Sequence, residues 1–133
     1  MILVDSSVWI DFLQDCESPQ TRRLAALIGK QRLATADLVL AEVLQGCRSE
    51  RLFRLTLFEM SSLPVLVIGS EDVAVQAARH HRALRARGIT VRKTIDTLIA
   101  TRCIMDGHHL LYSDRDFDPF VAHLGLKSAM AQG

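Results

Sequence analysis

The residues best suited to chemistry are four acids embedded in apolar runs: Asp5 in MILVD, Glu42 in LVLAEVL, Asp96 in TIDTLIA and Asp114 in HLLYSDRDF. An ionised carboxylate that leaves water costs several kcal/mol unless a partner compensates its charge. A divalent cation is the simplest partner for four converging carboxylates, and hard oxygen ligands suit Mg²⁺ or Mn²⁺. Such an ion polarises a phosphoryl oxygen and lowers the pKa of bound water. If the acids meet in space, the pattern predicts a metal-dependent enzyme acting on phosphate esters.

Each acid taken singly also has an ordinary explanation. Asp5 can cap the helix that follows it, and Asp96 can be a first-turn acid favoured by the helix dipole. Asp114 and Asp116 stand in a turn, where Asp is a common residue. Glu42 is harder to explain in this way, because Leu and Val surround it on a helical wheel. A helix that is apolar nearly all round is buried, which predicts that Glu42 enters the interior, unless it simply pairs with an Arg.

The elements that must position these acids alternate between short apolar strands and helices, which predicts an α/β sandwich around a mostly parallel sheet. The expected strands are 1–4, 32–35, 65–68 and 109–113, with a weak one near 124–127. The expected helices are 8–14, 21–28, 38–45, 50–61, 71–87 and 95–105, capped where Ser6 or Ser7, Asp37, Ser49, Ser70 and Thr94 precede them. Asp5 and Asp114 directly follow two strands, and open parallel sheets bind ligands at the carboxyl ends of their strands.

Size and composition indicate one compact domain, 1–133, with a frayed tail at 128–133. The 16 Lys and Arg nearly balance the 15 Asp and Glu, so net charge indicates no partner. The three cysteines form no CxxC motif, which favours reduced thiols. The first residues lack a basic segment, and no apolar run is long enough to span a bilayer. We therefore expect a soluble, cytoplasmic protein.

Four motifs, ILVDSSVWIDFL, LAEVLQG, TIDTLIA and LLYSDRDF, occur in this order at spacings that resemble the PIN-domain ribonucleases, and most closely the VapC toxins of bacterial type II toxin–antitoxin modules. The resemblance extends from Met1 to about Leu126. It implies a three-layer α/β/α fold and hydrolysis of RNA phosphodiester bonds by metal-activated water, with Mg²⁺ or Mn²⁺ as cofactor. Members of the family are usually homodimers that a cognate VapB-type antitoxin holds inactive.

The resemblance also assigns roles to particular residues. Asp5, Glu42, Asp96 and Asp114 match the four catalytic acids of the family. The metal ligands implied are Asp5, Asp96 and Asp114, together with Asp116, which falls where a further acid often follows the fourth and would ligate directly or through water. Ser6 occupies a Ser/Thr position that helps to orient the first Asp.

A basic segment directly precedes Asp96, because six of the 16 Lys and Arg lie between positions 79 and 93. RNA phosphates could follow such a stripe, and the RNA-binding candidates are Arg82, Arg85, Arg87, Arg92 and Lys93. The same charges could instead complement the dipole at a helix end and solvate its outer face. The two explanations are compatible.

The helix 50–61 has more apolar residues than one core-facing stripe needs, which indicates a dimer or antitoxin groove, or else a deeper place in the core. Two rival functions stay open. One is a phosphatase or DNA nuclease on a similar sheet, although no DxDx(T/V) motif follows the first strand. The other is a catalytically silent antitoxin-binding module, which would have little need for Glu42 in an apolar helix.

Overall fold

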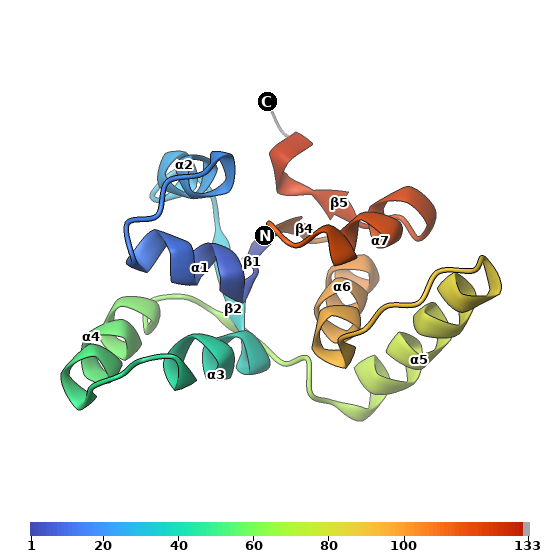
Figure 1. The fold of residues 1–133 in the computed structure, drawn as a ribbon, viewed down its shortest axis with the longest axis horizontal. Helices are drawn as coiled ribbons and strands as arrows, with labels where there is room; N and C mark the ends of the chain where they lie inside the picture. The colour runs from blue at the N-terminus through green and yellow to red at the C-terminus, as the bar shows by residue number, and fades with distance from the viewer. Residues whose placement is uncertain (132–133) are drawn as a thin grey trace.

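The computed structural model describes residues 1–131 as a five-stranded sheet with helices on both faces (Figure 1). The strands are β1 (Ile2–Val4), β2 (Leu33–Ala36), β3 (Val65–Leu66), β4 (His109–Leu111) and β5 (Lys127–Ser128). They lie in the order β3-β2-β1-β4-β5, and each neighbouring pair in this described part runs parallel. The predicted α/β fold with a mostly parallel sheet is confirmed.

The helices form two layers. On one side of the strands in Figure 1 lie α1 (Ser6–Leu13), α2 (Pro19–Leu27), α3 (Asp37–Gln45) and α4 (Glu50–Met60). On the other side lie α5 (Glu71–Ala86), α6 (Thr94–Asp106) and α7 (Asp118–His123). Crossovers between parallel strands are right-handed, so helices change face where the strand order reverses, between β1 and β4. The three-layer α/β/α arrangement is therefore also confirmed.

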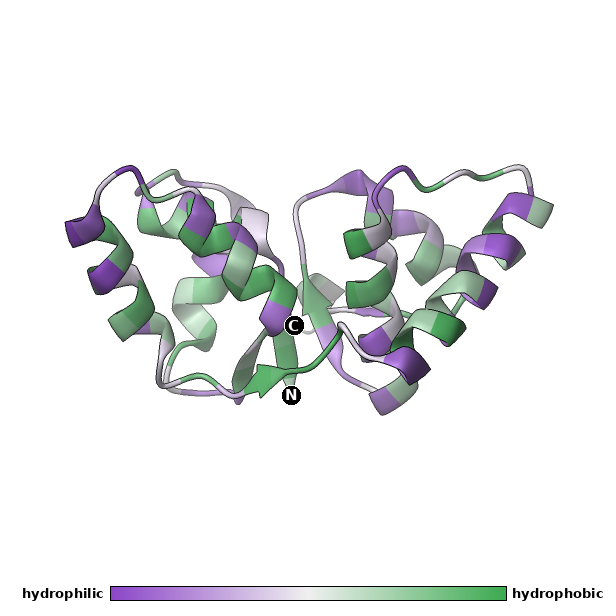
Figure 2. Ribbon diagram, turned by 90° about the horizontal axis from the view of Figure 1, so that it is seen from below, coloured by the Kyte–Doolittle hydropathy of each residue, from purple (hydrophilic) through white to green (hydrophobic). Residues whose placement is uncertain are grey.

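The central strands are continuous apolar runs that are buried on both faces. Leu3, Val4, Leu110 and Leu111 have no exposed surface. Figure 2 shows the middle of the sheet coloured as hydrophobic, whereas the outermost helices alternate between hydrophilic and hydrophobic residues. Parallel strands covered by helices on both faces have this composition. The core thus holds the carboxyl ends of β1 and β4 in fixed positions.

Several helix starts differ from the prediction by one or two residues; α2, for example, begins at Pro19 with Ser18 as its cap. Ser49 caps α4 as expected, since its hydroxyl accepts a backbone N–H of the first turn at 3.1 Å. Thr94, however, is the first residue of α6, and Lys93 occupies the cap position without a side-chain cap bond. Helix α1 likewise begins at Ser6, with Asp5 at the cap position and no side-chain cap bond. The carboxylate of Asp5 is therefore not used to cap the helix.

Helix α3 is not buried on all sides, which corrects the prediction for Glu42. Val39 and Val43 are its buried residues, whereas Leu38, Leu40 and Leu44 are only partly covered and Ala41 and Gln45 are exposed. Only one face of the helix packs against the core, and its other apolar side chains lie at the edges of that face. Glu42 is accordingly half-buried rather than interior.

The C-terminal segment is more ordered than the sequence predicts. A 3₁₀ turn (Arg115–Phe117) and α7 follow β4 where only a turn was expected. Strand β5 pairs with β4 at Lys127–Ser128, and Ala129 has no exposed surface. The expectation of a frayed tail is therefore wrong for 128–131, and its remainder, 132–133, lies outside the described residues.

The three cysteines, Cys16, Cys47 and Cys103, are free thiols, as predicted from their spacing. Cys103 is buried in the core, and burial raises the pKa of its thiol to about 12. Such a thiol is protonated and unreactive at neutral pH. Within residues 1–131, none of the helices is long and apolar enough to cross a membrane.

The crossover between the two helical layers is tied to the sheet by Asp37. This residue is the first of α3 rather than its cap, and its carboxylate accepts the backbone N–H groups of Ile68 at 2.8 Å and Gly69 at 3.3 Å. From the other layer, Arg102 Nη1 donates to the Val67 carbonyl at 3.2 Å. These bonds hold the segment between β3 and α5 against both layers.

We predict that Asp37→Ala lowers the free energy of unfolding by about 2 kcal/mol, because it removes two charge-assisted hydrogen bonds from a half-buried segment. Urea unfolding measures the change, and Glu59→Ala, at an exposed acid of α4, is the control. A loss no greater than that of the control would show that the crossover does not depend on Asp37.

Candidate metal centre

The sheet topology brings Asp5 and Asp114 to the same edge. β1 and β4 are neighbours, with Leu3 opposite Leu110 and Val4 opposite Leu111. The chain leaves β1 toward one helical layer and β4 toward the other, so this is the switch point of the sheet, where open α/β folds bind ligands. The backbone N–H of Asp5 donates to the Leu111 carbonyl at 2.9 Å, which continues the pairing one residue beyond β1.

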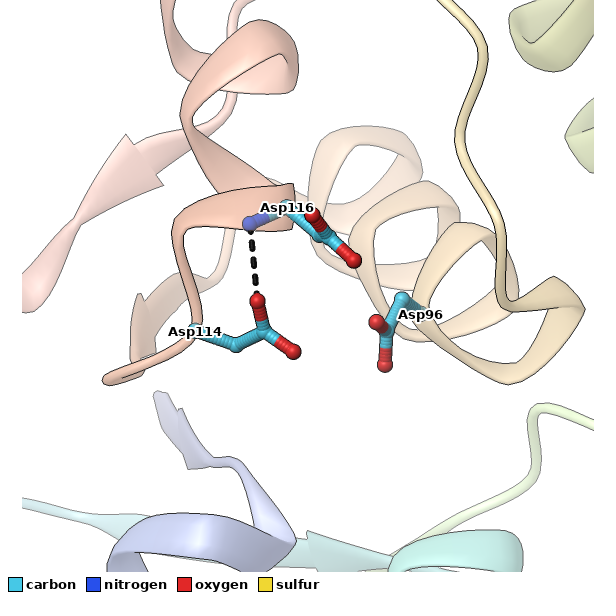
Figure 3. A group of neighbouring side chains, drawn as sticks. All are labelled: Asp96, Asp114 and Asp116. Carbon is cyan, nitrogen blue, oxygen red and sulfur yellow. Dashed lines mark hydrogen bonds between the residues drawn. The ribbon is translucent and has the colours of Figure 1, made fainter.

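Asp114 lies three residues beyond the end of β4 and not directly after it, because the strand ends at Leu111. Its carboxylate accepts the backbone N–H of Asp116 at 2.9 Å and thereby caps the 3₁₀ turn that follows. This bond folds the turn back so that both side chains face α6. In Figure 3 the carboxylates of Asp114 and Asp116 point toward that of Asp96.

Asp96, Asp114 and Asp116 form the tightest acidic group among the described residues. One carboxylate oxygen from each lies within 4.8 Å of the other two. Asp96 comes from the first turn of α6, and the other two come from the turn after β4. Asp116, which the sequence offered only as an additional ligand, thus stands inside the central group.

Asp5 and Asp96 are buried and incompletely satisfied. Their exposed fractions are 4% and 6%. Oδ1 of Asp5 and Oδ2 of Asp96 have no hydrogen-bond partner among the described residues. A buried oxygen that carries negative charge without a partner is strongly unfavourable, so these two oxygens fit a bound cation.

The electrostatics connect all four predicted acids. Burial, followed by the negative charge of Asp5, raises the pKa of Asp96 to about 7; Asp114 and Glu42 add to the rise. Burial also raises the pKa of Asp5, to which Glu42 adds repulsion, while a hydrogen bond from Ser7 opposes the rise. Like charges that raise each other's pKa must lie near one another. Asp5 and Glu42 are therefore near enough to influence Asp96, whereas the oxygens that lie within 4.8 Å of one another belong to Asp96, Asp114 and Asp116.

The hydrogen bonds that Ser6 and Ser7 make to these acids differ from the prediction. Ser7, not Ser6, donates to the Asp5 carboxylate, with its hydroxyl 2.9 Å from Oδ2. The Ser6 hydroxyl donates instead to Glu42 Oε1 at 3.1 Å and so links α1 to α3. The assignment of Ser6 as the residue that orients Asp5 is therefore wrong. One feature of the sequence could have indicated the role of Ser7: it is a hydroxyl residue two positions after Asp5 at the start of a helix, a spacing that permits a local hydrogen bond.

Lys93 supplies the positive charge nearest the cluster. Its Nζ lies 3.4 Å from Asp114 Oδ2, and the side chain is otherwise 64% exposed. The negative charge of Asp96, followed by the hydrogen bond to Asp114, raises the pKa of Lys93. One exposed ammonium compensates only part of the charge of several carboxylates. A divalent cation fits the remaining charge and the oxygen-only donor set.

The other basic candidates, Arg82, Arg85, Arg87 and Arg92, are exposed along α5 and the segment after it. None of these four takes part in an ion pair described within residues 1–131. Arg85 lies in the last turn of α5, where it also complements the helix dipole. Their charges are thus available to an anionic partner on the side of the molecule that carries α5 and α6.

An open parallel sheet with clustered carboxylates at its switch point defines an α/β domain built for divalent-metal chemistry. The PIN domain family matches residues 2–120, and the chain belongs to this family.

Two relatives match the chain along almost its whole length. "VapC ribonuclease Mb1587" of Mycobacterium bovis and "Ribonuclease VapC11" of Mycobacterium tuberculosis are each 28% identical over 131 residues, which cover 97% of this chain and 98% of the relative. Among solved structures, VapBC2 from Rickettsia felis, bound to a DNA fragment from its promoter, matches with a TM-score of 0.75 at 18% identity. That match covers 96% of this chain and 97% of the other. It confirms the fold.

We predict that Asp96→Asn stabilises the metal-free protein in a pH-dependent way. The native state holds the Asp96 proton up to about pH 7, whereas the unfolded chain releases it near 3.8. Above pH 3.8 the native protein therefore binds more protons, and its free energy of unfolding falls as the pH rises to about 7. In EDTA at pH 8 the variant should be more stable by about 2 kcal/mol, or about 5 °C in Tm.

Thermal unfolding from about pH 5 to pH 8 measures this difference, with Glu59→Gln as the control for an exposed acid. Added Mn²⁺ should reverse the order, because the native Asp96 gains a cation and the amide does not. A Tm difference that is constant across this pH range would contradict the assignment.

Proposed function

We propose that this protein is the toxin of a type II toxin–antitoxin pair, a ribonuclease that cleaves RNA with Mg²⁺ or Mn²⁺ bound at the acidic cluster. The observation that carries the proposal is the convergence of Asp96, Asp114 and Asp116 beside the buried, unpaired oxygens of Asp5 and Asp96. Full-length similarity to VapC ribonucleases supports RNA as the substrate.

The residues of this chain divide the work as follows. Asp96, Asp114 and Asp116 offer the oxygens that hold the ion, with Asp5 behind them. Ser7 keeps the Asp5 carboxylate turned toward the cluster, and the Ser6–Glu42 bond keeps a further carboxylate at its rim. When bound, a divalent ion supplies a water of lowered pKa and neutralises charge on the phosphate.

Positive charge at the mouth of the site favours a polyanionic substrate. Lys93 stands at the cluster and is mostly exposed, so it can hold a phosphate that approaches the acids. Arg82, Arg85, Arg87 and Arg92 extend this charge along α5 and the following segment. A single strand lying over this surface would place one phosphate at the cluster and its neighbours against the arginines.

An apolar surface on α4 fits an antitoxin segment. Leu52, Leu55, Leu57 and Phe58 are 50%, 48%, 41% and 78% exposed. Leu52 also borders a hollow of about 140 Å³ between α1, α3 and α4. A surface of this kind accepts an amphipathic helix or an extended apolar segment of another chain. Among the solved structures with a similar fold, one is described as a toxin-antitoxin complex from Klebsiella pneumoniae, and two others are VapBC complexes from Rickettsia felis and Salmonella typhimurium.

We also propose that two copies associate, and that the protein works in the cytoplasm as one domain. Val65, Val67 and Val75 are each about half exposed on β3, the crossover and α5, which gives a second apolar surface apart from α4. The free thiols of Cys16, Cys47 and Cys103 suit a reducing compartment.

The first test is cleavage of a single-stranded RNA by the purified protein with Mn²⁺, Mg²⁺ or EDTA. We predict activity with either metal and none in EDTA, and a loss of about 100-fold or more in Asp96→Asn and Asp116→Asn, because each removes one charged ligand of the cluster. The matched control is Asp118→Asn, an exposed acid two residues beyond Asp116, which should keep activity within about threefold.

The same assay separates the rival functions. A DNA strand of the same sequence and p-nitrophenyl phosphate are added as alternative substrates. Cleavage of DNA in preference to RNA would identify a DNA nuclease, and release of nitrophenol would identify a phosphatase. Binding of antitoxin without cleavage of any substrate would identify a silent binding module.

A second prediction concerns the partner. Co-expression with a VapB-type antitoxin should yield a complex that Phe58→Glu weakens by about 100-fold, because a charge enters the exposed apolar side of α4. Met105→Glu, at another exposed apolar residue, is the control. RNA cleavage by both variants should equal that of the native protein. Unchanged binding by Phe58→Glu would place the antitoxin elsewhere.

A further inference from the structure

A second cavity lies between α5 and α6, apart from the acidic cluster. Its volume is about 430 Å³, within the range of about 300–1,000 Å³ typical of small-molecule sites. Ala74, Ala77 and Ala78 line it from α5. Thr97 and Leu98 line it from α6. The side chain of alanine is only a methyl group, so the space between α5 and α6 stays open beside these three residues.

The cavity contains a polar group that lacks a partner. Thr97 is 2% exposed, and its hydroxyl has no hydrogen-bond partner among the described residues. Buried hydroxyls are nearly always bonded, and one that borders a cavity can be satisfied by a ligand inside it. A ligand for this cavity therefore has apolar surface for the alanines and Leu98, and a polar edge for Thr97.

The cavity is next to the site of cleavage in the proposed function. Thr97 follows Asp96 directly in α6, and consecutive Cα atoms are about 3.8 Å apart. Asp96 turns toward Asp114 and Asp116, whereas Thr97 turns toward α5. A substrate whose phosphate lies at the cluster would therefore bring its adjoining nucleotide to this cavity.

Positive charge surrounds the cavity. Arg82 lines it and is exposed, and no acidic side chain is among the described residues that line it. His81 also lines it, and its Nε2 lies 3.3 Å from the Val91 carbonyl, which ties the segment that carries Arg92 and Lys93 to α5. A positively charged side chain beside an apolar cavity suits a ligand in which a flat, largely apolar ring is linked to a phosphate.

We propose that the cavity between α5 and α6 binds a nucleobase of the RNA next to the phosphate held at the acidic cluster. The faces of the base lie against Ala77, Ala78 and Leu98, its polar edge bonds to the Thr97 hydroxyl, and Arg82 holds its phosphate. The proposal rests on the ribonuclease function proposed above and adds a determinant of sequence preference, since bases differ in their polar edges.

The test measures binding of the four nucleoside 5′-monophosphates by amide chemical-shift changes in the native protein, with Ca²⁺ in place of Mn²⁺. Ribose 5-phosphate is the ligand without a base. We expect shifts at Ala77, Ala78, Thr97 and Leu98, and binding of at least one nucleotide that is about tenfold or more tighter than that of ribose 5-phosphate.

Two variants probe the cavity itself. Ala78→Leu fills it from an exposed helix position, and Thr97→Val replaces the hydroxyl with a methyl group of similar size. Both should lose the advantage of nucleotides over ribose 5-phosphate, and Thr97→Val should keep the native Tm because its hydroxyl makes no bond within the protein. Ala83→Leu, an exposed position of the same helix outside the cavity, is the matched control and should bind as the native protein does.

Three results would overturn the proposal: shifts confined to the acidic cluster, ribose 5-phosphate binding as tightly as every nucleotide, or full nucleotide binding by Ala78→Leu. A change from dimer to monomer in Ala78→Leu without loss of nucleotide binding would assign the cavity to contact between copies. Nucleotide binding does not require cleavage, so the two proposals can fail separately. If the protein binds the base but leaves RNA intact with Mn²⁺, the ribonuclease function is contradicted and the base-binding site is still supported.

Discussion

Two buried carboxylates, those of Asp5 after β1 and Asp96 in the first turn of α6, are the constraint on which the rest of the structure depends. Asp5 and Asp96 are almost fully covered, and each keeps an oxygen without a partner among the described residues. Burial, followed by the negative charge of Asp5, raises the pKa of Asp96 to about 7. Such an arrangement is unfavourable without a compensating charge. The exposed Lys93 compensates part of it, and a divalent cation fits what remains.

This constraint also explains why the two helical layers must be fixed to one sheet. Asp5 and Glu42 belong to the layer that follows β1 and β2, whereas Asp96 belongs to the layer that follows β3. Asp96, Asp114 and Asp116 meet within one side of the sheet, but Asp5 and Glu42 come near them only when both layers are docked. Asp37, through its bonds to Ile68 and Gly69, holds the crossover between them, so a residue remote from the chemistry contributes to the geometry of the site.

The elements themselves were largely predictable. Within residues 1–131, apolar runs mark all five strands to within a few residues, and apolar spacing together with turn residues marks six of the seven helices. The short helix α7 was missed because Asp-Pro reads equally as a turn or a helix start. Helix α3 was expected to be buried all round, but periodicity cannot tell which apolar side chains a neighbouring layer will cover. Glu42 was misplaced for that reason.

The sequence by itself determined the α/β class, the family and which acids could form a site, because these depend on residue types and on their order along the chain. Tertiary structure alone decided which oxygens meet: Asp116 entered the central group, Ser7 took the role expected of Ser6, and Thr97 was left facing a cavity. Hydrogen bonds operate over about 3 Å and metal ligation over about 2 Å, whereas one residue along a helix turns a side chain by about 100°. Contacts that short depend on how α1 and α6 are rotated against the sheet, which the spacing of residues does not encode.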